Sequence, residues 1–123
     1  MRTLSAVVAA GWLSVTAMAG GQDAQAPMVL RGEIVEASCF AKGVAQGTGP
    51  KHVACAKECA QKGQALGILT EDDGMIKITG DYAANNYAKL LDFVGKRVEV
   101  RGTQDRYLDY SRAIKVTRVT LVK

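Results

Sequence analysis

The chain has 123 residues, of which 48% are hydrophobic, 6% aromatic and 23% charged, and its formal net charge at pH 7 is +4. This length fits one small domain with a modest core. Basic residues are spread along the chain and mixed with acidic ones, which argues against a surface for polyanions, so we expect no nucleic-acid partner.

The N-terminus has the pattern of a secretory signal peptide. Arg2 precedes an uncharged, apolar run from Leu4 to Met18, and Ala17-Met18-Ala19 is a typical cleavage box. The run is shorter than the ~20 residues that a membrane-spanning helix needs, so we expect cleavage and no membrane span afterwards. The protein is therefore expected to be exported, to a bacterial periplasm. The predicted division is a signal peptide at 1–19, a flexible lead at 20–27 and one domain at 28–123.

The predicted elements alternate between strands and two helices. Residues 28–37 form a predicted strand with a bend at Gly32. A loop is expected at 40–49, which holds three glycines, followed by a helix at 50–62 that starts at Pro50 and stops at Gly63. Strands at 65–70 and 75–79 flank a hairpin turn at 72–74.

The second half of the chain continues in the same way. The latter part of 81–94 has apolar residues at helical spacing and is predicted to be a helix that ends at Gly95. A strand at 96–103, a polar connection at 104–112 and a strand at 113–122 follow, the last with an irregularity near Thr117 or Arg118. Without the first helix, this is the element order of an OB barrel. We predict a mainly β fold with two helices, a five-stranded OB-like barrel whose first helix is inserted between strands 1 and 2.

The three cysteines and the one histidine of the chain form a single cluster in the sequence, Cys39, His52, Cys55 and Cys59, with the spacing C-x12-H-x2-C-x3-C. On one helix, the last three side chains fall within an arc of roughly 60°. The rise from His52 to Cys59 is ~10 Å, however, so His52 joins the thiols only if the first helical turn is loosened or its side chain reaches down the helix. Lys51 and Lys57, with the helix N-terminus, are expected to lower the pKa values of the thiols.

Such a ligand set suits zinc or copper(I), and an iron–sulfur unit less well. We expect Cys39, Cys55 and Cys59 as thiolate ligands and His52 as a possible fourth. Alternatives are a disulfide from Cys39 to one of the other thiols, with one thiol left over, and thiol–disulfide redox chemistry. The spacing matches neither a c-type haem motif nor a thioredoxin motif.

Four segments of the chain resemble a known family: Gly32–Cys39 (GEIVEASC), His52–Ala56 with Cys59 (HVACA, then C), Gly63–Leu69 and Gly95–Gly102. The chain is similar to a family of small exported bacterial proteins with an OB-like barrel and a C…H-x-x-C-A-x-x-C motif. This resemblance implies the fold and the site, and no reaction.

These observations favour a small periplasmic protein that binds a metal or a cofactor and has no enzymatic activity, with a periplasmic protein as its partner. One alternative class is a thiol–disulfide or electron-transfer protein. Another is an OB-type binding module whose cysteines have only a structural role.

Overall fold

The structure is a computed structural model, which describes residues 26–43 and 47–123. The predicted signal peptide at 1–19 and residues 20–25 of the predicted lead lie outside the described residues. Pro27, the last residue of the predicted lead, is the first residue of a strand. Within the described ranges, no helix combines the length and the apolar character that crossing a membrane requires.

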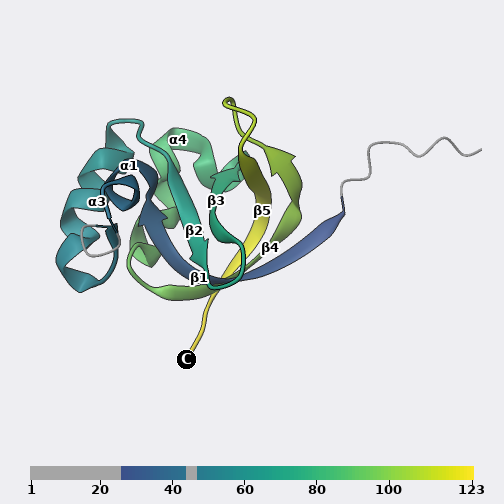
Figure 1. Ribbon diagram of the computed structural model, residues 1–123, viewed down its shortest axis with the longest axis horizontal. Helices are drawn as coiled ribbons and strands as arrows, with labels where there is room; N and C mark the ends of the chain where they lie inside the picture. The colour runs from purple at the N-terminus through teal and green to yellow at the C-terminus, as the bar shows by residue number, and fades with distance from the viewer. Residues whose placement is uncertain (1–25, 44–46) are drawn as a thin grey trace, which may run out of the picture.

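The protein is a small mixed α/β domain built on a closed ring of five strands (Figure 1). The strands are β1 (Pro27–Glu36), β2 (Leu66–Thr70), β3 (Gly74–Thr79), β4 (Arg97–Arg106) and β5 (Arg112–Leu121). Around the ring they follow the order β1-β2-β3-β5-β4. The pair β3 and β5 is parallel, and the other pairs are antiparallel. All five predicted strands are thus present.

β1 closes the ring because it pairs with two strands in succession. Residues 27–33 pair with β4, and residues 33–36 pair with β2. The strand changes partner at the predicted bend, where a Cβ on Gly32 would lie 2.0 Å from the carbonyl oxygen of Leu69. Only glycine lets the two backbones come this close, so the bend is a requirement of ring closure.

β5 contains the predicted irregularity. Its pairing with β4 shifts from Arg101↔Arg118 to Gly102↔Val116, which leaves Thr117 as an extra residue. The Thr117 hydroxyl donates a hydrogen bond to the carbonyl oxygen of Arg101 at 3.2 Å. This is a β-bulge, which increases the local twist that a closed sheet needs. The predicted polar connection at 104–112 is wrong in its first part, because β4 continues to Arg106 and pairs there with β5.

The inside of the ring is the hydrophobic core. Its fully buried aliphatic side chains come from all five strands and one neighbouring segment: Ile34, Leu66, Ile68, Ile76, Ile78, Leu90, Val98, Val100 and Ile114. At about 25 cal/mol per Å² of apolar surface removed from water, each of these side chains contributes about 1.5–3 kcal/mol. This core stabilises the ring, and the helix residues Ala56 and Ala60 pack against it.

The connection between β1 and β2 holds the helical part of the molecule. It contains α1 (Ala37–Ala41), the 3₁₀ turn η1 (Pro50–His52) and α3 (Val53–Gln61), which lie together beside the ring in Figure 1. The helix predicted at 50–62 is confirmed, with a left-handed Gly63 (φ 91°) after its end. The loop predicted at 40–49 is wrong at its start, because α1 takes residues 37–41.

The helix predicted in the second half of 81–94 is only partly present. The chain forms η2 (Gly80–Ala83), α4 (Ala84–Tyr87) and η3 (Ala88–Phe93). Asn85, Asn86 and Tyr87 have positive φ values of 54°, 53° and 62°, which interrupt any continuous helix. Asparagine tolerates this conformation, and the reversal buries both Tyr87 and Leu90 in the core. Gly95 (φ 75°) ends the segment as predicted.

Candidate metal site

The four residues predicted from the sequence come together between α1 and α3. Cys39 lies on α1, His52 is the last residue of η1, and Cys55 and Cys59 lie on α3. The segment from β1 to α3 therefore supplies the whole cluster. The three cysteines are free thiols, so the structure contains no disulfide.

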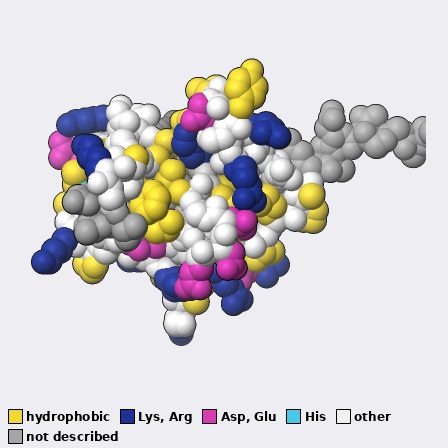
Figure 2. Space-filling model, viewed as in Figure 1, with side chains coloured by type: hydrophobic (Ala, Val, Ile, Leu, Met, Phe, Trp, Pro, Cys, Tyr) yellow, Lys and Arg dark blue, Asp and Glu magenta, His cyan; other side chains and the backbone are white. Residues whose placement is uncertain are grey.

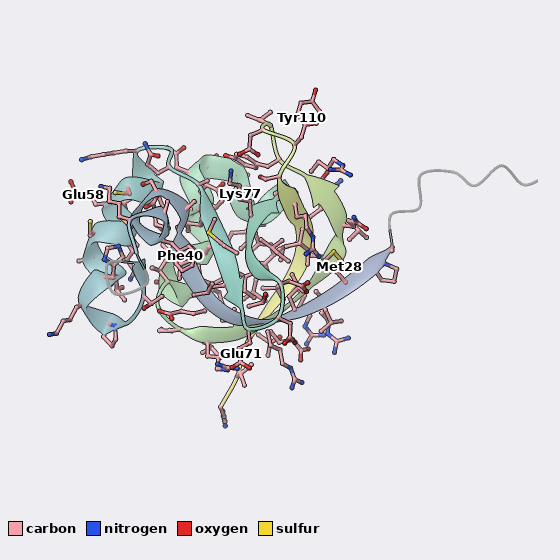
Figure 3. The ribbon with its side chains drawn as sticks, in the orientation of Figure 1. Met28, Phe40, Glu58, Glu71, Lys77 and Tyr110 are labelled. Atoms are coloured by element: carbon pink, nitrogen blue, oxygen red, sulfur yellow. The ribbon has the colours of Figure 1, made fainter. Side chains whose placement is uncertain are left out.

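The packing of α3 determines which way its thiols face. Ala56 and Ala60 are fully buried and belong to the hydrophobic core, so this side of the helix faces the ring. Cys55 and Cys59 each precede one of these alanines and lie on the adjacent flank, where the sulfur of each lies within 4.8 Å of that of Cys39. Glu58 occupies the outer surface, where its side chain pairs with Lys62 at 2.8 Å (Figure 3).

The turn that precedes α3 is a 3₁₀ turn and not a turn of α-helix, which is one of the two ways in which His52 was expected to reach the thiols. Residues 50–52 form a 3₁₀ turn, in which the N–H of His52 donates to the carbonyl oxygen of Gly49 at 3.1 Å. A 3₁₀ turn has three residues per turn instead of 3.6, so it rotates His52 relative to its position on an α-helix. The start of this turn is held by Glu33, whose carboxylate accepts a hydrogen bond from the N–H of Gly49 at 2.7 Å.

The donor atoms form two triangles that share Cys39. In the first, the sulfurs of Cys39 and Cys55 and a ring nitrogen of His52 all lie within 4.8 Å of one another. In the second, the sulfurs of Cys39 and Cys59 and a carboxylate oxygen of Glu36 do so. Cys39 belongs to both triangles and is therefore the central ligand of the cluster. The Cys59 side chain also contacts the thiols of Cys55 and Cys39.

One ring nitrogen of His52, Nε2, is buried and has no hydrogen-bond partner among the described residues. A buried polar nitrogen without a partner costs about 1–3 kcal/mol. A metal ion bound to this nitrogen removes that cost, and the neighbouring thiols are the soft ligands that zinc and copper(I) prefer. The donor set therefore fits a metal ion, although the geometry does not distinguish between these two metals.

The prediction from the sequence did not include Glu36, which holds the backbone of Cys39 in place by a hydrogen bond. Its side chain is fully buried and forms the N-cap of α1, where it accepts hydrogen bonds from the backbone N–H groups of Ser38 (3.0 Å) and Cys39 (2.7 Å). The Ser38 hydroxyl donates to both carboxylate oxygens, at 2.9 and 2.8 Å. A signal was present in the sequence, because Glu36 alternates with Ile34 on the core face of the strand. A buried carboxylate there needs partners.

Glu36 and burial control the protonation of the thiols. A hydrogen bond from the Cys39 thiol to Glu36, together with burial, raises the pKa of Cys39 to about 12. Burial and the neighbouring Cys55 raise the pKa of Cys59. Burial raises the pKa of Glu36 as well, but the hydrogen bonds from Cys39 and Ser38 outweigh this and leave it below its ordinary value.

The expected lowering of the thiol pKa values by Lys51 and Lys57 is therefore wrong for Cys39 and Cys59. The reason is that Glu36 and burial act on Cys39, and burial and Cys55 act on Cys59, in the direction that raises the pKa. Without a metal, these two thiols hold their protons, so metal binding releases them. High pKa values also make Cys39 and Cys59 poor nucleophiles, which weighs against redox chemistry at these two positions.

Comparisons of the chain with models of protein families, with curated proteins and with solved structures find no match. What can be said of function therefore depends on the geometry of the cluster itself.

Proposed function

We propose that this protein is a small exported metal-binding protein that holds one soft metal ion, zinc or copper(I), between α1 and α3. The observation that carries the proposal is the donor cluster of Cys39, Cys55 and His52, whose ligand atoms lie within 4.8 Å of one another and whose histidine has a buried Nε2 without a hydrogen-bond partner among the described residues. No step of a reaction is assigned to the site, and its role is binding.

In this proposal Cys39, Cys55 and His52 form the first three ligands, since their donor atoms already lie within 4.8 Å of one another. Cys59 is the fourth ligand, since its sulfur already lies within 4.8 Å of that of Cys39. A closed Cys₃His set is a common structural zinc site, and three thiolates also suit copper(I). Glu36 stays in place as the group that orients Cys39, because its oxygens are occupied by the cap of α1.

The ring of strands is part of the proposal as well. Its order β1-β2-β3-β5-β4 and the helical segment between β3 and β4 support an OB-like barrel. The signal-peptide pattern at the N-terminus supports export to the periplasm. We include in the proposal membership of the exported family that the chain resembles, with the cluster as its defining site.

The test is elemental analysis of the mature protein purified from periplasm, combined with a count of free thiols under denaturing conditions. We expect one equivalent of zinc or copper, and three titratable thiols once the metal is released. Cys59→Ser and His52→Ala should each lower the bound metal, whereas Glu58→Gln on the same helix should leave it unchanged, because Glu58 faces solvent. No metal and a single free thiol would contradict the proposal and indicate a disulfide instead.

A further inference from the structure

The ligands of the proposed site differ in their access to solvent. Cys39 is buried, with 8% of its surface exposed, and Cys59 is half-buried. His52 is half-buried, and its Nε2 is completely enclosed. Cys55, in contrast, is exposed. A metal ion held by these four residues would therefore be closed on the side of Cys39 and open on the side of Cys55.

The buried side of the site is also the better anchored one. The backbone N–H of Cys39 donates to Glu36, which is itself fully buried, and this bond does not depend on the protonation of the thiol. Cys55 lies on the outer flank of α3, next to the exposed Ala54. A ligand held by a buried network resists displacement, whereas a ligand at the surface exchanges with an incoming group.

The helical segment that carries Cys55 has more basic than acidic side chains. Between Pro50 and Lys62 there are three lysines against one glutamate, and Glu58 already pairs with Lys62. Lys51, in the η1 turn four residues before Cys55, is exposed. Figure 2 shows Lys and Arg side chains bordering the surface over the helical part of the molecule. Such a surface attracts an anionic group, including a thiolate.

Resting on the proposed function, we propose that Cys55 is the exchangeable ligand through which the metal passes to or from a cysteine thiol of a partner protein. The incoming thiol loses its proton and forms a sulfur–metal bond. The bond between the metal and the Cys55 sulfur then breaks, and the Cys55 thiolate takes up the proton. Neither the sulfurs nor the metal changes oxidation state. The fitting partner presents an exposed cysteine beside acidic side chains, which complement the lysines.

Rescue by an external thiol tests this proposal. Cys55→Ala removes an exposed ligand and leaves a gap that a small thiol can enter from solvent. We expect this variant, loaded with Co²⁺ as a spectroscopic substitute for zinc, to lose most of its thiolate-to-metal absorption. Added 2-mercaptoethanol should restore the band, because its sulfur takes the place of the missing one. Bound Co²⁺ is counted in the same samples after gel filtration.

Cys59→Ala is the matched control, because it removes one thiol from the same helix at a half-buried position. It should lose the band and not recover it with 2-mercaptoethanol, and Cys39→Ala should behave in the same way if it folds. Equal rescue of Cys55→Ala and Cys59→Ala, or no rescue of Cys55→Ala, would overturn the exchange proposal while the metal site remained. If the wild-type protein bound neither Co²⁺ nor zinc, that result would instead contradict the proposed function, and the exchange role would fail with it.

Discussion

Glu36→Ala tests the link between the fold and the cluster most directly. The substitution removes a fully buried carboxylate that joins the end of β1 to the start of α1. It takes away the acceptor for the backbone N–H groups of Ser38 and Cys39 and the partner of the Cys39 thiol. We expect α1 to lose its cap and Cys39 to lose its fixed position.

The expected loss of stability follows from these contacts. The N–H of Cys39 is buried, so leaving it without an acceptor costs about 1–3 kcal/mol. Ser38 is exposed, so water replaces the carboxylate there, and its share is the loss of an N-cap, about 1 kcal/mol. Together these effects lower the free energy of unfolding by about 2–4 kcal/mol. For a domain of this size, the Tm falls by roughly 10–30 °C.

Calorimetry of the metal-free protein measures the change in Tm, and titration with Co²⁺ measures the change at the site. Glu58→Ala is the control, since Glu58 lies on the surface of α3 and loses only an exposed pair with Lys62, which contributes little to stability. If the two variants had the same Tm, Glu36 would not hold α1 in place, and the account of how Cys39 is positioned would be wrong.

Three further predictions concern the ring, its pH dependence and the metal. Gly32→Ala should lower the free energy of unfolding by at least about 1–3 kcal/mol in urea titrations, because its Cβ would clash with the Leu69 carbonyl; an unchanged midpoint would contradict the bend. The Nζ atom of Lys77 lies 2.6 Å from a carboxylate oxygen of Asp109 and lowers the pKa of that carboxyl group. The ion pair therefore contributes fully to stability above the pKa of Asp109 in the unfolded chain, about 4, and this contribution is lost as the pH falls below it. The Tm difference between wild type and Asp109→Asn should therefore shrink as the pH falls from about 5 to about 2. A difference that stays constant over this range would argue against the pair. Zinc at about 100 times its Kd should raise the Tm by roughly 10–20 °C, an increase that a chelator reverses, whereas a Tm insensitive to zinc would speak against the site.

Much of the ring could be predicted from local patterns. Alternating and β-branched segments indicate the five strands, and the break in alternation near Thr117 marks the bulge. Gly32 marks the bend of β1, and Pro50 and Gly63 mark the ends of the first helical segment. These features are visible in sequence because each depends on the conformational preferences of a few adjacent residues.

Where the prediction was wrong, contacts between distant residues decided the structure. The latter part of 81–94 was predicted to be a helix, but the burial of Tyr87 and Leu90 against the ring favours three short turns with left-handed asparagines. The helix α1 has little helical signal of its own, and the carboxylate of Glu36 caps it from the end of a strand. Local propensity is weaker than tertiary packing in such short segments.

For the site, the sequence alone determined which residues take part, because Cys39, His52, Cys55 and Cys59 are the only cysteines and the only histidine in the chain. It also indicated that His52 needs either a loosened first turn or a side chain that reaches down the helix, since the rise of a helix is a local property. Only the tertiary structure decided that Cys39 is the centre of the cluster and that Glu36 stands behind it. It also decided which thiol is buried and which is open to solvent. The burial of a side chain and its distance from other side chains are set when β1, α1 and α3 pack together. The spacing of residues within one segment does not predict them.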